Sequence, residues 1–324
     1  MDGERVGEVL TEKGSEKETE EVMEKDRTRR IKGILYILLA AFFFALMSVF
    51  VRLSGDVPTM QKAFFRNIVA AFAAAAILVR NGTGRPAVFG RIFRREAMPT
   101  LFGEALPTLL LRSIFGTAGI LANFWAVDHL GIADANMLNK LSPFFAILMS
   151  IFILGEKPNR VEWLSVLLAF IGAAFVAKPS TGIVSFPALV GIFGGFAAGT
   201  AYTYVRKLGL MGVKGPAVVL FFSAFSTLVL TPNLLLHYQP MTAQQLGFLL
   251  LAGASAAGGQ LSVTAAYQNA PARDISVFDY SQVVYAALLG FMLFGEVPDA
   301  WSLVGYVIII GTAFAKWAYV MRTS

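Results

Sequence analysis

The chain contains a succession of apolar stretches, each about twenty residues long and separated by short polar or turn-forming segments. A hydrocarbon core of ~30 Å takes roughly 20 helical residues to cross, so each stretch has the length of a membrane span. Backbone groups in lipid must be hydrogen-bonded internally, which favours helices. The sequence predicts an all-α polytopic membrane protein with ten transmembrane helices, at about 33–52, 61–79, 107–127, 132–154, 161–177, 187–205, 216–236, 245–267, 274–294 and 301–320.

Composition agrees with this class and excludes several others. Only 15% of the residues are charged, whereas soluble domains have about a quarter. The chain has no cysteine, so disulfides, thiolate nucleophiles and thiol metal sites are excluded. We find neither a His-x-x-x-His nor a Gly-x-Ser-x-Gly motif, and the basic residues lie between apolar runs, without a nucleic-acid motif. We therefore expect no enzyme activity, metal, cofactor or nucleic-acid partner, and membrane lipids as the surroundings.

The two ends of the chain are polar. Residues 1–30 carry ten acidic and seven basic side chains, which is too polar for a buried core. This segment is expected to be a disordered or surface-helical cytoplasmic tail, and residues 321–324 are expected to form a short C-terminal tail.

Charge in the connections predicts the orientation, because Lys and Arg accumulate on the cytoplasmic side. With the N-terminus inside, the outer segments hold three such residues, Arg52, Lys62 and Lys178. The inner segments hold sixteen: Arg27, Arg29, Arg30, Lys32, Arg80, Arg85, Arg91, Arg94, Arg95, Lys157, Arg160, Arg206, Lys207, Lys214, Arg273 and Arg322. Both termini are expected to be cytoplasmic, in a multi-pass protein of the cell (inner) membrane.

The two halves of the chain resemble each other. MLNKLSPFFAILMSIFILGEKP (137–158) aligns with VFDYSQVVYAALLGFMLFGEVP (277–298) at a constant offset of 140 residues. We expect a first five-helix repeat at 31–177, a linker at 178–186 and a second repeat at 187–320. Because five spans is an odd number, the second repeat must be inverted relative to the first. Inverted repeats indicate alternating access, with a substrate site near the bilayer midplane between the repeats.

Several of these features together resemble the drug/metabolite transporter superfamily, in particular its EamA-type members. They are Arg66 early in the second span, Arg112 opening the third, Pro143 in the fourth, and the Gly-Glu endings at 155–156 and 295–296. The sequence departs from the pattern in a long basic loop at 80–106 and in Val283, which stands at the position equivalent to Pro143. The resemblance implies an inner-membrane carrier of small organic solutes, often an exporter of amino acids or other metabolites.

A lysine in the fourth span gives the first candidate for a solute site. Lys140 lies eight residues into the span, or ~12 Å at 1.5 Å per residue, and ionisable residues at this depth usually face a partner or a wet cavity. Spacings of three and four place Asn136, Asn139, Lys140 and Pro143 on one helix face. The equivalent positions of the second repeat are Ser276, Asp279, Tyr280 and Val283.

If both faces point into the cleft between the repeats, Lys140 supplies a cation, Asp279 an anion, and Asn136, Asn139 and Gln282 amide groups. Such a set suits a zwitterionic or amine-bearing solute, with Lys140 binding its carboxylate and Asp279 its ammonium group. The alternative is that Lys140 and Asp279 pair with each other and stabilise helix packing without contacting the solute.

Other residues are further candidates. Gln260 and Tyr267 share a face of the eighth span, and Tyr202 lies in the sixth. Pro143 should bend the fourth span, as a hinge or as a static kink. Arg66 and Arg112 lie within about two turns of opposite surfaces, where their long side chains can reach headgroups, so they are interpreted as gate residues.

The function predicted is a secondary transporter that moves an amino acid, amine or related metabolite by alternating access, as an exporter. A lipid or lipid-carrier flippase on the same fold is the main alternative, and a membrane-embedded enzyme is the weaker one. Asp279 is the candidate for proton coupling, which stays open, as does the choice between monomer and homodimer.

Overall fold

The structure is a computed structural model and describes residues 2–81, 103–130, 132–177 and 185–323. The described segments are helical, with no strand among them. The elements are α1 (Asp2–Leu53), α2 (Thr59–Asn81), α4 (Leu106–Leu130), α5 (Ile132–Asn139), α6 (Ser142–Leu154), α7 (Arg160–Ala177), α8 (Phe186–Leu210), α9 (Gly215–His237), α10 (Ala243–Asn269), α11 (Ala272–Ile275), the 3-10 helix η2 (Ser276–Tyr280), α12 (Ser281–Phe294) and α13 (Ala300–Thr323).

The all-α membrane architecture is confirmed, because nine segments of the described chain are long and apolar enough to cross a bilayer. The eighteen-residue helix α7 occupies the predicted fifth span but is not among the nine, so the number ten stays a prediction. Most of the expected loop at 80–106 and of the linker at 178–186 lies outside the described residues.

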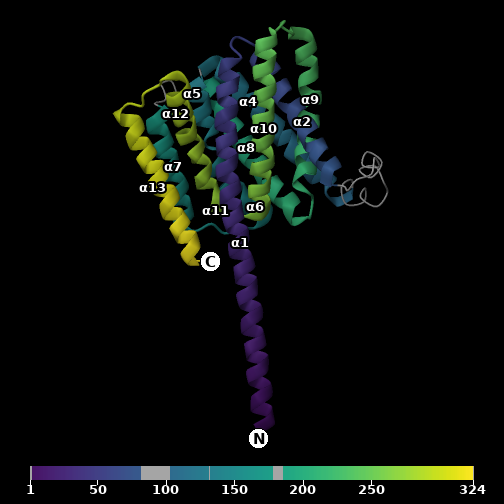
Figure 1. Cartoon of the computed structure of the whole chain (residues 1–324), viewed down its shortest axis with the longest axis vertical. Coiled ribbons are helices and arrows are strands. Elements are labelled where there is room, and N and C mark those ends of the chain that lie inside the picture. Colours follow the sequence, from purple (N-terminus) through teal and green to yellow (C-terminus); the bar gives the residue numbers. More distant parts are fainter. Residues whose placement is uncertain (1, 82–102, 131, 178–184, 324) are drawn as a thin grey trace.

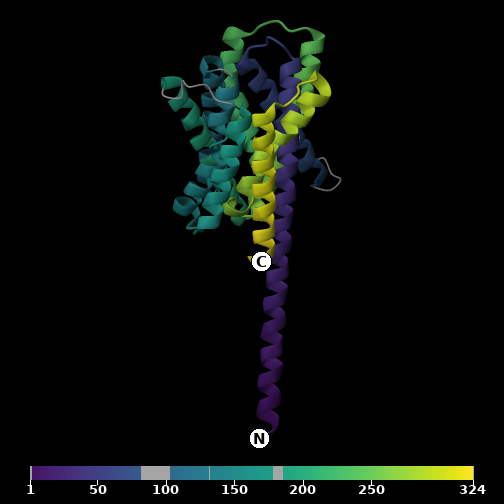
Figure 2. The same cartoon turned by 90° about the vertical axis from the view of Figure 1, so that its left-hand side faces the viewer.

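The polar N-terminal segment is helical. Residues 2–30 continue directly into the first span as one helix, α1, which projects far beyond the bundle (Figures 1 and 2). The assignment of this segment as a cytoplasmic tail stays a prediction. The N-terminal and C-terminal ends lie on the same side of the bundle.

The helix packing shows the expected two-fold relation between the repeats. Helix α1 packs on α10, and its repeat equivalent α8 packs in the same way on α4, the equivalent of α10. Likewise α6 packs on α8, and α12 packs on α1. The pairs α2–α9 and α7–α13 join equivalent helices of the two repeats directly. This pattern means that the two halves interlock, each completing the core of the other.

Equivalent helix ends have the same local geometry at opposite ends of the bundle. Helices α6 and α12 end at Gly155 and Gly295, which have left-handed φ values of 69° and 68°. In both, the following Glu donates its backbone N–H to a carbonyl six residues back, from Glu156 to Ser150 and from Glu296 to Gly290. Because α6 ends on the side of the chain termini and α12 on the other, the repeats are inverted (Figure 1).

The fourth and ninth spans are discontinuous, which differs from the continuous helices expected. The fourth is interrupted at Lys140 and Leu141, between α5 and α6. The ninth consists of α11, η2 and α12, and the change from η2 to α12 falls at Tyr280 and Ser281, which are the repeat equivalents of Lys140 and Leu141. Pro143 stands in the first turn of α6, beyond the break, where its missing N–H is not needed. It therefore begins a helix here and does not bend a continuous one.

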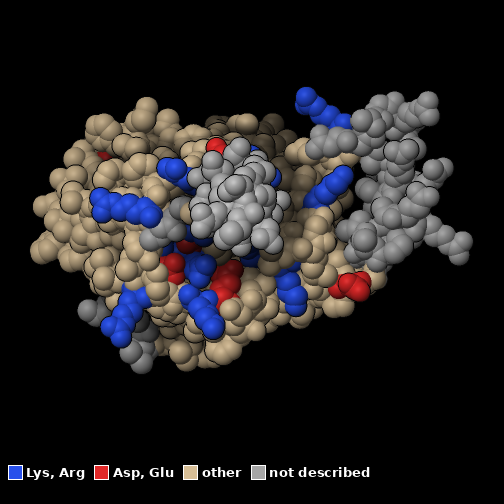
Figure 3. Space-filling model, turned by 90° about the horizontal axis from the view of Figure 1, so that it is seen from below, with Lys and Arg blue, Asp and Glu red and all other residues tan. Residues whose placement is uncertain are grey.

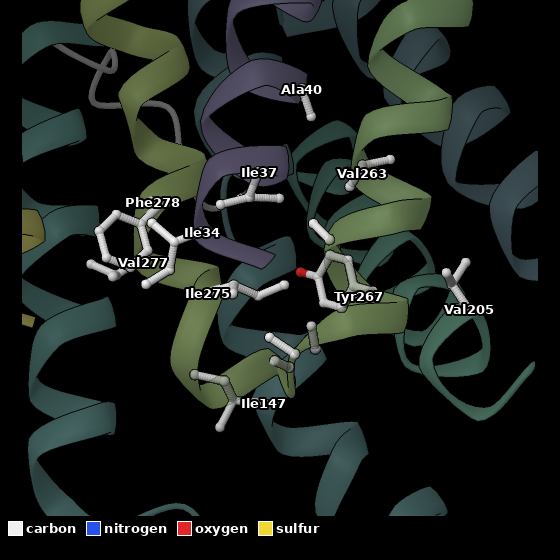
Figure 4. Close-up of a cluster of buried hydrophobic side chains, with 14 of the residues drawn as sticks. Ile34, Ile37, Ala40, Ile147, Val205, Val263, Tyr267, Ile275, Val277 and Phe278 are labelled. Carbon is white, nitrogen blue, oxygen red and sulfur yellow. The ribbon is translucent and has the colours of Figure 1, made fainter. Parts of the chain in front are cut away.

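The hydrophobic core surrounds these interruptions. Ile34 and Ile37 of α1, Ile147 of α6, Val263 of α10 and Ile275 of α11 are at most 5% exposed and form one cluster (Figure 4). Many large apolar side chains on the outside of the bundle are instead exposed, as expected where helices face lipid. The core thus holds the broken helices in place from α1, α8 and α10.

A stripe of glycines lets α8 approach the break in the fourth span. A Cβ on Gly199 would lie 2.5 Å from the carbonyl oxygen of Ser142 and 2.7 Å from the amide nitrogen of Ala146. A Cβ on Gly195 would lie 2.8 Å from the carbonyl oxygen of Leu138. These are backbone atoms of the fourth span, which cannot move away as a side chain could by changing its rotamer. The glycines are therefore explained by the close packing of α8 on the fourth span.

We expect Gly199→Ala to lower the stability of the protein by about 1–3 kcal/mol, because the added methyl group overpacks this contact. The matched control is Gly247→Ala in α10, where nothing lies within 4 Å and alanine favours the helix by up to about 1 kcal/mol. Thermal unfolding of both variants in the same detergent checks the difference. Equal melting temperatures for the two would show that the α8 contact is not tight.

Candidate functional site

A polar cavity of about 100 Å³ lies between the two repeats. Helices α2, α4 and α5 of the first repeat and α8, α9 and α10 of the second contribute to its wall. The lining polar residues are Arg66, Arg112, Asn123, Asn139, Tyr202 and Gln260. None of the described lining residues is acidic, so the cavity wall carries two positive charges. A water molecule needs about 10–15 Å³ of such volume, so the cavity has room for a small solute group.

Arg112 is the most deeply buried charge of this cavity, with 2% of the residue exposed. Its guanidinium carbon lies 4.0 Å from the centre of the Phe222 ring, in a cation–π contact. Nη2 reaches Oε1 of Gln260 at 3.5 Å, which is long for a hydrogen bond. Within the described structure, the Nε atoms of Arg112 and Arg66 are buried and have no hydrogen-bond partner. The arginines therefore retain donors for a further partner.

Lys140 and Asp279 form an ion pair at the helix breaks. Nζ of Lys140 lies 3.0 Å from Oδ2 of Asp279 and donates to Oε1 of Gln282 at 2.7 Å. The two charged side chains are only 16% and 14% exposed. The hydroxyl of Tyr280 donates to the carbonyl oxygen of Lys140 at 2.8 Å. The structure thus joins the two broken spans through the pairing that the sequence left open as an alternative to solute contact.

Two tyrosines connect the cavity to the core. Tyr202 lines the cavity, and its ring stacks on that of Tyr267, with centroids 5.0 Å apart and planes 11° apart. Tyr267 is 1% exposed and lies in the hydrophobic cluster, next to the broken ninth span (Figure 4). Tyr267 therefore packs against the Tyr202 ring and holds it in position at the cavity wall.

The structure divides the residues that the sequence proposed into groups. Asn139, Tyr202, Gln260, Arg66 and Arg112 line the cavity, whereas Lys140, Asp279, Tyr280 and Gln282 form the adjoining hydrogen-bonded group. Asn136 is exposed, and Ser276 is buried.

Sequence reasoning placed the arginines at gates near the surfaces, but their guanidinium groups turn inward. Phe222, an apolar residue in an apolar span, was not predicted as part of the site.

Two equivalent acidic residues mark opposite ends of the bundle. At the end away from the chain termini, Glu296 forms an ion pair with Arg52 at 2.5 Å. At the other end the equivalents are Glu156 and Arg206, which interact electrostatically, but Oε2 of Glu156 is buried and unpartnered within the described residues. Burial raises the pKa of Glu156, while Ser150, Arg206 and Arg273 oppose this shift. Within the described residues, a direct ion pair therefore joins the helices at one end of the bundle, and the equivalent residues at the other end do not form one.

The raised pKa of Glu156 predicts a pH dependence. When the pKa of an acid is higher in the folded protein than in the unfolded chain, the protein is most stable at a pH below the unfolded-state pKa. This stability is lost as the pH rises through the folded-state pKa, because the buried carboxyl must then become charged. We therefore expect Glu156→Gln to raise the melting temperature at neutral pH, with the gain shrinking as pH falls toward the ordinary glutamate range.

Glu296→Gln is the matched control, since Glu296 is exposed and paired, and it should show no such gain. A melting-temperature difference for Glu156→Gln that does not change with pH would contradict this assignment.

Basic side chains are distributed over the end of the bundle that carries both termini (Figure 3). The connections described there include Lys157 and Lys214. The connections at the opposite end, residues 54–58, 238–242 and 295–299, contain no Lys or Arg. The charge difference predicted for the two faces thus holds in the described connections.

Comparison with known proteins agrees with this architecture. The chain matches the EamA-like transporter family over residues 31–178 and 185–315. It is 31% identical over 287 residues to the pseudopaline exporter CntI of Pseudomonas aeruginosa (strain UCBPP-PA14), covering 87% of this chain and 95% of that protein.

More distant similarities extend to other transporters and to a solved structure. The chain is 25% identical to human solute carrier family 35 member G1, with 88% and 80% covered, and 24% identical to a riboflavin transporter of Rhizobium johnstonii, with 91% and 92% covered. A solved structure titled "Crystal structure of protein" has the same fold, with a TM-score of 0.74, 15% identity, and 90% and 98% covered. The chain belongs to the EamA-like transporter family of the drug/metabolite transporter superfamily.

Proposed function

We propose that this protein is a secondary transporter that exports a small organic solute, an amino acid, amine or related metabolite, across the inner membrane by alternating access. The observation that carries the proposal is the polar cavity that holds Arg66 and the buried Arg112, because residues of both inverted repeats line it. Sites at the interface of inverted repeats, next to discontinuous helices, are typical of secondary transporters.

The unequal ends of the bundle support alternating access. The Arg52–Glu296 pair fastens one end, and the equivalent residues Arg206 and Glu156 lack such a contact in the described structure. An exchange of these two arrangements would open one end as the other closes. The basic face and both termini support a cytoplasmic location for the end at Glu156. Export is supported by the similarity to a protein named as an exporter.

The group around Lys140 and Asp279 would link the solute to the helix breaks. Asn139 lines the cavity and is the neighbour of Lys140, so movement of the break would alter the cavity wall. Pro143, at the start of α6, would let α6 pivot about this point. Asp279 is the residue we propose for proton coupling, since release from Lys140 would make its carboxylate available.

Transport assays in proteoliposomes test the proposed function. Purified protein should move one or more members of a panel of amino acids, amines and organic acids, and an imposed pH gradient should alter the rate if protons are coupled. A parallel assay with fluorescent lipids tests the flippase alternative. Lipid translocation without movement of any panel solute would overturn the transporter proposal.

A further inference from the structure

We propose that Arg66 and Arg112 form a subsite that binds the carboxylate group of the transported solute. The inference rests on the proposed function and narrows its substrate class to organic anions and zwitterions. It also moves the carboxylate from Lys140, where the sequence suggested it, to the arginine pair.

The cavity contains two positively charged arginines and no described acidic residue to balance them. Arg112 is 2% exposed and the Nε atoms of both arginines lack partners in the described structure, while the described lining contributes no carboxylate. An unpaired buried charge is strongly unfavourable, and pairing with an anion of good geometry removes this penalty. The bound solute is the missing anion.

The geometry of the guanidinium group favours a carboxylate as the group that binds. A guanidinium group presents donors in a planar fork that matches a carboxylate in a bidentate manner. The Phe222 ring lies against one face of the Arg112 guanidinium, which leaves its edge for the solute. Asn123, Asn139, Gln260 and the Tyr202 ring complete the wall and can contact the uncharged remainder of the solute.

Lys140 is less suited to this role because its charge is already satisfied. Its Nζ contacts the carboxylate of Asp279 at 3.0 Å and the amide oxygen of Gln282 at 2.7 Å. A solute carboxylate at Lys140 would have to displace Asp279. At the arginine pair it displaces no protein anion among the described lining residues.

A glycine one turn from Arg112 leaves room for the guanidinium group. A Cβ on Gly116 would lie 2.2 Å from Nη1 of Arg112 and 2.7 Å from Cε2 of Phe222. Gly116→Ala should therefore displace the guanidinium group of Arg112 without removing its charge. This variant tests whether solute binding depends on the position of the group as well as on its charge.

The test is solute binding to the full-length protein in lipid nanodiscs, measured as a shift in melting temperature over a concentration series. The probes are succinate, its neutral amide succinamide, the diamine putrescine and inorganic phosphate. We expect succinate to stabilise the protein and the other three to stabilise it less. Removing charge-assisted hydrogen bonds in Arg66→Gln or Arg112→Gln should weaken succinate binding about 10- to 100-fold.

Control variants keep the result interpretable. Arg160→Gln changes an exposed arginine at the start of α7 and should bind succinate normally. Arg112→Lys keeps the positive charge but not the planar fork of donors, so its affinity for succinate should lie between those of the wild type and Arg112→Gln. Gly116→Ala should also have an intermediate affinity. If Arg112→Gln fails to fold, these two variants still test the inference.

Three results would overturn the inference: equal stabilisation by succinamide, stronger stabilisation by phosphate or putrescine, or unchanged succinate binding in both arginine variants. Failure of every solute in the proteoliposome panel would overturn the transporter instead, and would leave arginine-dependent succinate binding as support for the subsite.

Discussion

Replacing Lys140 with methionine should destabilise the protein by about 3–5 kcal/mol, because Asp279 is then left as an uncompensated charge. The pair is mostly buried, and it joins the break between α5 and α6 to the equivalent break in the ninth span. The double variant Lys140→Met with Asp279→Asn should recover most of the loss, since neither charge remains. Thermal or denaturant unfolding of the single and double variants in one detergent checks both expectations.

An exposed ion pair provides the control for this experiment. Arg52 and Glu296 are 56% and 54% exposed, and pairs of this kind contribute about 0–1 kcal/mol. Arg52→Met should therefore have a small effect on unfolding. If Lys140→Met is no more harmful than Arg52→Met, or if the double variant recovers nothing, the pair does not fasten the two breaks.

Cross-linking either end of the bundle should stop transport completely. The chain has no cysteine, so thiols introduced at Arg52 and Glu296, or at the equivalent Arg206 and Glu156, are the only ones that react. A reversible bifunctional methanethiosulfonate reagent would hold one end closed, and alternating access requires both ends to open in turn. Uptake into proteoliposomes should fall to the level of protein-free liposomes and return after reduction.

Each single-cysteine variant, treated with the same reagent, controls for the loss of the charge and for modification of one thiol. These variants should transport in the presence of the reagent. Undiminished transport by a fully cross-linked protein, verified by its altered mobility on a gel, would contradict the assignment of that end as a gate.

The sequence predicted the helical membrane fold and the inversion well, because both depend on local and repetitive signals. Span length follows from hydrophobicity, and the repeated Gly-Glu ending shows that Gly155 and Gly295 have equivalent roles. The same alignment paired Lys140 with Tyr280, and the hypothesis that the fourth and ninth spans face each other was built on that pairing. The hydrogen bond from Tyr280 to the carbonyl of Lys140 agrees with that relation.

The helix breaks and the position of the charged cavity could not be derived in this way. A break at Lys140 and Leu141 leaves no apolar gap in the sequence, and Pro143, the visible signal, lies beyond it. Arg66 and Arg112 start near opposite surfaces, so their depth in sequence suggested headgroup contact. Because arginine side chains are long, only tertiary packing decides whether they extend outward or inward, and here Phe222 and Gln260 hold Arg112 inside.

Paired distance measurements test whether the two inverted repeats open the cavity alternately to the two sides. Spin labels at Leu53→Cys with Val297→Cys report on one end, and labels at the equivalent Lys207→Cys with Lys157→Cys report on the other. Addition of the transported solute should change the two distances in opposite directions. Distances that both increase, both decrease or both stay constant while the protein transports would contradict alternating access.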